Sequence, residues 1–323
     1  IRDELAASQP DVEVAVLAHR TRGGWGGRLA GSLMAVRAGW ALARSRVVVI
    51  DDYFFPVYAV RPRRGTTVIQ TWHASGAFKT FGHSVANRTF GADAALTHRV
   101  RIHANYDLAL VGSQASAPAF AEAFGMPIER VVSRHGIPRT DLLCEPARRE
   151  RATAEVRARL RLPAGRRVIL YAPTFRGDRV TEARHRDDLD LHRLAELLGE
   201  DHVLLLRLHP FVRRSVRLDT SLAGFVRDVS SEPDINALMP VCDVLVTDYS
   251  SAIFEFALLG RPMGFFAPDL ADYEAEHPEP AQAPPADRVE PTRPERIIII
   301  GSGPAGIAAA ADLARRGYGV TVF

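Results

Sequence analysis

Short apolar runs alternate with helix-like stretches along most of this chain. Runs rich in Val, Ile and Leu predict strands that are buried on both faces of a sheet. We expect such strands at 12–18, 47–50, 67–70, 108–111, 131–132, 168–171, 203–206, 225–229 and 244–246. Strands joined through helices pair in parallel, because the crossover helix returns the chain to the same end of the sheet. The sequence therefore predicts an α/β protein with two doubly wound parallel-sheet domains, 1–140 and 141–273.

The stretch 28–44 predicts a helix near the N-terminus. Its apolar residues follow roughly helical spacing and are Leu29, Leu33, Val36, Trp40 and Leu42. We favour the interpretation in which this apolar side covers a sheet. Arg28, Arg37 and Arg44 leave open the alternative that the helix lies on anionic lipid. Further helices are expected at 141–160, 189–198 and 234–239.

Composition excludes several classes of protein. The formal net charge is only +3, and the 41 basic residues are mixed with 38 acidic ones, so we expect no nucleic-acid partner. Cys144 and Cys242 form neither a disulfide framework nor a metal spacing, which favours a reducing cytoplasmic setting. No apolar run reaches the roughly 18 to 20 residues of a spanning helix. Because the chain starts at Ile1 and stops at Phe323 in a strand-like pattern, we expect a piece of a longer protein.

The stretch CDVLVTDYSSAIFEFALLGRPMGFFAPD, residues 242–269, reads strand, polar turn, helix, strand. Thr247, Asp248, Ser250 and Ser251 lie between the strand and the helix. Free backbone N–H groups, the helix dipole and hydroxyl donors at such a turn favour an anion such as phosphate. In the alternative interpretation, Ser250 and Ser251 only cap the helix.

Two histidines follow predicted strands. His73 lies in QTWHASGAFK and can take a proton from a hydroxyl group. Lys79, the single lysine of the chain, follows it and can hold an anionic substrate. His209 lies in RLHP beside Arg207, where both could face a phosphoryl oxygen. For each histidine the alternative is a structural side chain bonded to backbone, and chance retention is the alternative for Lys79.

Taken in order, five strings resemble the CDP-glycerol glycerophosphotransferase family, which polymerises teichoic-acid backbones, over residues 40–273. They are VIQTWHASGAFKTFG, HGIPRTD, LYAPTFRGD, LLLRLHP and the segment from PDINALMPVCD to FFAPD. The resemblance implies the two-domain GT-B fold, with the donor bound mainly by the second domain. It implies His73 as the base and His209 as the group that stabilises the diphosphate. The residues it implies for the CDP-glycerol site are Thr174, Arg176, Thr247, Asp248, Ser250 and Ser251. Ala74 departs from the family, since many members have Gly there.

The implied reaction moves glycerol phosphate from CDP-glycerol to a hydroxyl of a polyol-phosphate or lipid-linked acceptor and releases CMP. CDP-ribitol or a nucleotide sugar is the alternative donor. Positioning and charge stabilisation suffice for phosphoryl transfer. We therefore expect no cofactor, and no tightly bound metal because no metal-type spacing occurs. Since the acceptor polymer is made at a membrane, we expect peripheral attachment to the inner face of the cell membrane, with arginines docking on anionic lipid.

The C-terminal part predicts a separate unit. Residues 274–295 are proline-rich and predict a linker. Residues 296–323 predict a strand–turn–helix–strand fragment in which Gly301, Gly303 and Gly306 form a dinucleotide-binding fingerprint that resembles the start of an FAD- or NAD-binding flavoprotein domain. A fragment of a flavin- or nicotinamide-linked oxidoreductase fusion is therefore the alternative from another class. We expect the fragment to be non-functional here, because one βαβ piece cannot enclose a cofactor.

Overall fold

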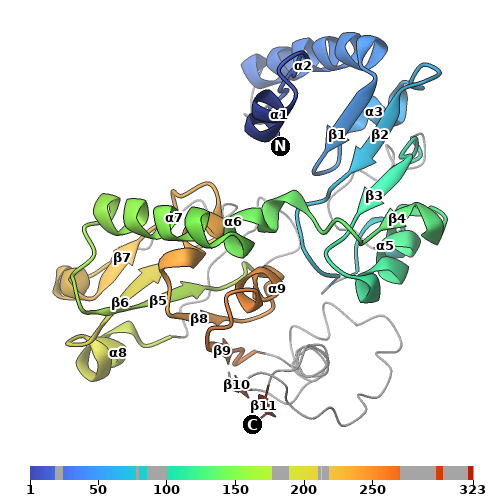
Figure 1. Ribbon diagram of the computed structural model, residues 1–323. Coiled ribbons are helices and arrows are strands. Elements are labelled where there is room, and N and C mark those ends of the chain that lie inside the picture. The colour runs from blue at the N-terminus through green and yellow to red at the C-terminus, as the bar shows by residue number, and fades with distance from the viewer. Residues whose placement is uncertain are drawn as a thin grey trace. The chain divides into compact units, whose positions relative to one another are not determined.

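The computed structural model describes residues 1–18, 25–77, 80–85, 100–176, 189–209, 212, 218–269, 296–300 and 319–322. The chain divides into two compact units, one formed by 1–73 with 81–138 and the other by 74–80 with 139–323 (Figure 1). The short segment 74–80 belongs to the second unit, which the predicted domain boundaries did not anticipate. Lys79, the linker 274–295 and the three fingerprint glycines lie outside the described residues.

The first unit contains a four-stranded parallel sheet in the order β1-β2-β3-β4. The strands are β1 (Val47–Ile50), β2 (Thr67–Gln70), β3 (Leu108–Leu110) and β4 (Val131–Val132). The described helices of this unit are α1 (Arg2–Ser8), α2 (Trp25–Arg44), α3 (Phe55–Ala59) and α5 (Ala117–Phe124), with 3-10 turns at Gly82–Val85, Gln114–Ser116 and Ile128–Arg130. Ile50 pairs with Gln70 at the ends of β1 and β2, so the residues that follow both strands leave the same edge of the sheet.

Two predictions for the N-terminal region are wrong. Residues 12–18 form no strand, and Val12 and Val16 are exposed, because an apolar run becomes a strand only where a neighbouring strand pairs with it. The predicted helix exists as α2, but the prediction that its apolar side covers a sheet is wrong. Four of the five apolar residues are exposed, namely Leu29, Leu33, Val36 and Trp40, whereas Leu42 is buried.

The second unit contains a parallel sheet in the order β11-β10-β9-β8-β5-β6-β7. Its central strands are β5 (Arg167–Ala172), β6 (His202–Leu206), β7 (Val226–Asp228), β8 (Val244–Thr247) and β9 (Met263–Phe266). The chain builds outward from β5 through β6 to β7 and then returns to the other side of β5 with β8. This reversal is the topological switch of a doubly wound sheet, where ligands bind beyond the carboxyl ends of the strands.

Helices cover both faces of this sheet, as Figure 1 shows for α7 and α8. Alternate residues of β5 face opposite sides, which joins Leu170 to a core with α7 (Pro146–Arg159) and α9 (Ala252–Ala257), and Ile169 to a core with α8 (Leu191–Leu198). The predicted helix 141–160 is divided into α6 (Asp141–Cys144) and α7, because Pro146 starts a new helix at its first position. The predicted helix 234–239 consists of 3-10 turns at Ile235–Ala237 and Met239–Val241, and a further turn spans Thr220–Gly224.

The C-terminal strands join the second sheet. β10 (Arg296–Ile300) pairs in parallel with β9, and β11 (Gly319–Val322) pairs with β10. The predicted strands therefore exist, but they extend the sheet of the second unit. A sequence pattern predicts a strand without telling which sheet edge it will join, and the exposed edge of β9 offers the hydrogen bonds that β10 needs.

The α/β class with two parallel sheets is confirmed. Among the described strands, the reversal of a doubly wound sheet occurs in the second unit, while β1 to β4 follow one another in sequence. Alternation of strands and helices predicts parallel pairing but not strand order, so the sequence could not distinguish these two arrangements.

Candidate active site

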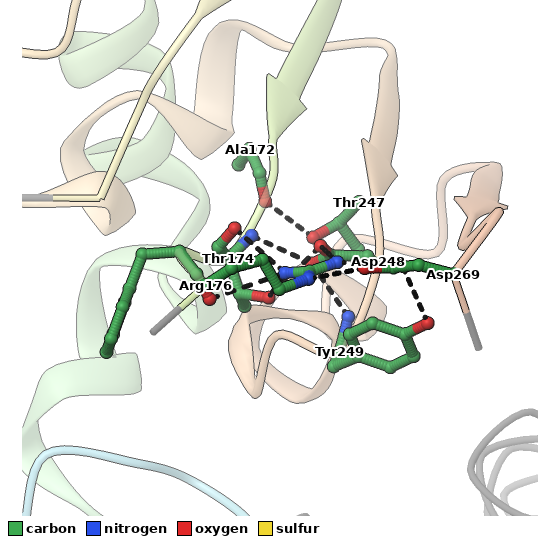
Figure 2. A network of polar contacts seen from close by, with 8 residues as sticks. Ala172, Thr174, Arg176, Thr247, Asp248, Tyr249 and Asp269 are labelled. Atoms are coloured by element: carbon green, nitrogen blue, oxygen red, sulfur yellow. Dashed lines mark hydrogen bonds and ion pairs between the residues drawn. The ribbon is translucent and has the colours of Figure 1, made fainter. Parts of the chain in front are cut away.

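Polar side chains from three strand ends meet at the switch point of the second sheet. Thr174 and Arg176 follow β5, Asp248 follows β8, and Asp269 follows β9. Figure 2 shows these side chains pointing toward one another. The neighbouring pairs β5–β8 and β8–β9 are parallel, so their carboxyl ends lie at one edge. This edge is the place where an open α/β sheet binds its ligand.

Asp248 is the centre of the network. Its Oδ1 accepts hydrogen bonds from the backbone N–H groups of Thr174, at 2.8 Å, and Tyr249, at 2.7 Å. Its Oδ2 accepts from the Thr174 hydroxyl and from Nη2 of Arg176, each at 3.0 Å. The carboxylate is buried. Asp248 was predicted to bind substrate. In the structure its two carboxylate oxygens hold the loops after β5 and β8 together.

Arg176 connects this pair of loops to the loop after β9. Its Nε and Nη2 bind the two oxygens of Asp269 at 2.7 and 3.0 Å, a bidentate geometry that only a planar guanidinium provides (Figure 2). Tyr249 donates its hydroxyl to Asp269 at 3.2 Å and lies under the guanidinium, 5.0 Å from ring centre to Cζ. Burial alone would raise the pKa of Asp269, but the hydrogen bonds from Arg176 hold it below its usual range.

One cation thus faces two carboxylates in this network. Arg176 was predicted to bind substrate, and its guanidinium is engaged by Asp248, Asp269 and the Thr174 hydroxyl. The network forms part of the wall of a small recess. The recess is lined by Tyr171, Pro173, Thr174, Arg176, Asp248, Phe266 and Pro268. The arrangement holds three loops in one geometry around that recess.

The predicted hydroxyl donors have different surroundings. The Thr247 hydroxyl is fully buried and donates to the backbone oxygen of Ala172 at 2.6 Å, so it fastens β8 to β5. Ser250 accepts a hydrogen bond from the N–H of Ala252, the first residue of α9, at 3.2 Å. Ser251 is half-buried at the start of α9, which spans only six residues.

Arg207 and His209 lie after β6. Arg207 is buried, and its Nη2 donates to the backbone oxygen of Glu232 at 3.0 Å. Burial lowers the pKa of Arg207 despite the neighbouring carboxylates. The His209 ring is half-buried and lies 4.6 Å from the ring of Phe175, centre to centre. Since Phe175 stands between Thr174 and Arg176, His209 borders the same loop as the network.

His73 belongs to the first unit, in the turn after β2. Its ring stacks on Trp72, with centres 4.3 Å apart, and its Nδ1 lies 3.6 Å from Oδ1 of Asp52. Asp52, and Asp269 and Glu255 of the second unit, were not among the site residues predicted from the sequence. Asp52 and Asp269 follow predicted strands, and because ligands bind beyond the carboxyl ends of parallel strands, this position is a signal that could have found them. Glu255 lies within a helix, and no local signal marked it.

Comparison with known proteins decides the family. The sequence profile described as CDP-Glycerol:Poly(glycerophosphate) glycerophosphotransferase matches residues 27–282. The chain belongs to this family. The family prediction from the ordered motifs is confirmed.

Relatives of this family member include both alditol types. The teichoic acid ribitol-phosphate primase of Bacillus spizizenii is 39% identical over 274 residues, covering 84% of this chain and 70% of the relative. The teichoic acid glycerol-phosphate primase of the same organism is 34% identical over 237 residues, covering 73% and 60%. Other relatives are longer, and the chain spans 37% of the poly(ribitol-phosphate) polymerase of that organism.

Solved structures of the wall teichoic acid polymerase TagF are similar to this family member. One has a TM-score of 0.63 at 28% identity, covering 84% of this chain and 66% of TagF. A TagF variant with CDPG has a TM-score of 0.60 at 32% identity, covering 71% and 56%.

Within the described part of the chain, no helix is long and apolar enough to span a membrane, and no group of three metal-type side chains gathers. The expected lack of a metal or cofactor stays a prediction.

Proposed function

We propose that this family member transfers an alditol phosphate from a CDP-activated alcohol to an acceptor hydroxyl and releases CMP. The observation that carries the proposal is the convergence of the family motifs on the switch point of the second sheet. Thr174 and Arg176 come from one motif and Asp248 comes from another, and direct hydrogen bonds join them there. A GT-B arrangement, with the donor on the second unit, agrees with this placement.

The transfer needs one proton acceptor and one place for the developing charge. His73 takes the proton of the acceptor hydroxyl as its oxygen bonds to the donor phosphorus that carries the alditol. The bond from that phosphorus to the bridging oxygen breaks, and CMP leaves with the electron pair. His209, beside the Phe175 loop, stabilises the negative charge on the diphosphate. Lys79 binds the anionic substrate, and Ser251 contributes to the donor turn in this scheme.

The alditol of the donor has two candidates. The ordered motifs of the glycerophosphotransferase family favour CDP-glycerol. The 39% identity to a ribitol-phosphate primase, compared with 34% to a glycerol-phosphate primase, favours CDP-ribitol as the second candidate. A thermal-shift series with CDP-glycerol, CDP-ribitol and UDP-sugars distinguishes them, because a ligand that binds the folded state raises the melting temperature.

The acceptor in this proposal is an anionic polyol phosphate or a lipid-linked primer at the inner face of the cell membrane. The exposed apolar side of α2 supports peripheral attachment there. Leu29, Leu33, Val36 and Trp40 stand at helical spacing on that side, and Arg37 and Arg44 are exposed on the same helix. Apolar contact with acyl chains and attraction of arginine to anionic headgroups would act together.

A test of the proposed function incubates the protein with each CDP-alditol and a lipid-linked primer, and measures CMP by chromatography. We expect CMP release that depends on the acceptor. Failure to release CMP with any alditol donor, by protein that is folded by circular dichroism, would contradict the proposal.

A further inference from the structure

Asp52 lies opposite His73 at the carboxyl edge of the first sheet. It is the second residue after β1, and His73 is the third residue after the neighbouring parallel strand β2. Oδ1 of Asp52 and Nδ1 of His73 are 3.6 Å apart. The two side chains are 64% and 51% exposed, so both remain accessible to a substrate. Their proximity follows from the parallel register, which brings the two strand ends together.

A buried amide fixes the backbone on both sides of this pair. Gln70 is fully buried, and its Oε1 accepts a hydrogen bond from the N–H of Trp72 at 2.8 Å. Its Nε2 donates to the backbone oxygen of Asp52 at 3.3 Å and to the Tyr106 hydroxyl at 3.0 Å. The Gln70 side chain thus holds the backbone of Asp52 and the backbone of Trp72, which precedes His73.

The turn that presents His73 is conformationally restrained. Trp72 has φ of 53°, in the left-handed region that large side chains rarely adopt. Such strain persists only where the surrounding structure enforces it, and it is concentrated at functional sites. The buried Trp72 ring stacks on His73 at 29° and meets the Tyr53 ring edge-on at 5.2 Å. The plane of the imidazole is therefore set by stacking, with Nδ1 on the Asp52 side.

We propose that Asp52 is the positioning residue of His73. The carboxylate accepts the Nδ1–H group, so Nε2 is left without a proton and faces the acceptor hydroxyl. This inference rests on the proposed function, in which His73 is the base. When Nε2 takes the proton, the imidazolium forms beside a negative charge, and the 3.6 Å separation contracts to a charge-assisted hydrogen bond. Asp52 stays ionised throughout, as the carboxylate does in a Ser-His-Asp triad.

The neighbouring residue supplies a matched control. Asp51 has the same charge and is also exposed, but the contact to the imidazole is made by Asp52. We expect Asp52→Asn to lower kcat by about 10- to 100-fold, a part of the roughly 100- to 10,000-fold that a general base contributes. Donor affinity measured by calorimetry should stay within about twofold, because the partner of His73 is the acceptor. Asp51→Asn should retain wild-type kcat, and melting curves should show that both variants fold.

A spectroscopic measurement separates this inference from the proposed function. We expect ¹⁵N spectra of the histidine rings at about pH 8.5, where imidazoles are neutral, to show His73 as the Nδ1–H tautomer. The signal is assigned by its loss in His73→Gln. Asp52→Ala should shift it to the Nε2–H tautomer that free histidine prefers, and Asp51→Asn should not. A wild-type Nε2–H tautomer, or equal effects of both substitutions, would overturn the role of Asp52. Absence of CMP release with the expected tautomers would contradict the proposed function instead.

Discussion

Oε1 of Glu255 accepts two hydrogen bonds from Ser75, one from its hydroxyl at 2.8 Å and one from its backbone N–H at 3.2 Å. Nε of Arg139 lies 2.9 Å from the same oxygen. Glu255 is only 2% exposed and stands on α9, directly after the turn with Ser250 and Ser251. Ser75 is therefore fastened to α9 within the second unit by a buried carboxylate.

Glu255 should make stability depend on pH in a direction opposite to that of most carboxylates. Burial raises the pKa of Glu255 above its ordinary value of 4.5, while Arg139 and Ser75 lower it less strongly. The folded state then holds the proton more tightly than the unfolded state does. The contribution of Glu255 is fully present below pH 4.5 and is lost as the pH rises through the raised pKa.

Urea unfolding of the wild type and of Glu255→Gln tests this prediction. The free energy of unfolding of the wild type minus that of the variant should fall as the pH rises from about 4 to about 8. Glu196→Gln, in an exposed pair with Arg193, serves as the control and should show little change. A difference that rises with pH would mean that the ion pair with Arg139 dominates over burial.

Arg176→Ala should destabilise the second unit strongly. The substitution leaves Asp248 and Asp269, both buried, without the cation that faces them. Uncompensated buried charge typically costs about 3 to 5 kcal/mol in the free energy of unfolding. Arg193→Ala removes an exposed arginine of an ion pair and should cost less than about 1 kcal/mol. Equal losses in urea titrations of the two variants would contradict a bracing role for Arg176.

The sequence located the strands of the site better than the roles of its side chains. The family resemblance selected residues that follow β5 and β8, and Thr174, Arg176 and Asp248 do meet. What each side chain contacts depends on tertiary neighbours that local sequence does not contain. Thr247 was selected with Asp248, yet it is the last residue of β8 and its hydroxyl bonds inward to Ala172.

The same limit explains the errors in the first unit. Helical spacing showed that Leu33 and Trp40 share a side of α2, but spacing cannot tell whether a sheet covers that side. The pairing of β10 with β9 likewise depends on an edge formed by distant residues. Asp52 could have been selected because it follows a predicted strand, whereas its pairing with His73 became evident only from the register of β1 with β2.

The double substitution of Leu33 and Trp40 by Ser should reduce membrane binding. Both side chains are exposed on α2, so their removal lowers the apolar area available to lipid without emptying a core. A smaller fraction of the double variant than of the wild type should float with vesicles rich in phosphatidylglycerol. Ile128→Ser, at another exposed position, should float as the wild type does. Wild-type flotation that is insensitive to salt and to anionic lipid would contradict electrostatic docking.

Substitution of the two histidines should damage different steps. His73→Ala should lower turnover by about 100- to 10,000-fold while calorimetry shows nearly normal donor affinity. His209→Ala should weaken donor binding or lower turnover by roughly 3 kcal/mol of transition-state stabilisation, the loss expected for one preorganised donor. The exposed His192 provides the control, since His192→Ala should retain both properties. Near-wild-type turnover of the first two variants would assign both histidines a structural role.

The proposed transfer is tested most directly by measuring CMP release from CDP-glycerol and CDP-ribitol, side by side, with and without a lipid-linked primer. We predict primer-dependent release of CMP from at least one of these donors, no nucleotide release from UDP-sugars, and loss of CMP release in His73→Ala. Release of nucleotide from a UDP-sugar but from neither CDP-alditol, by the same folded protein, would contradict the proposed transfer.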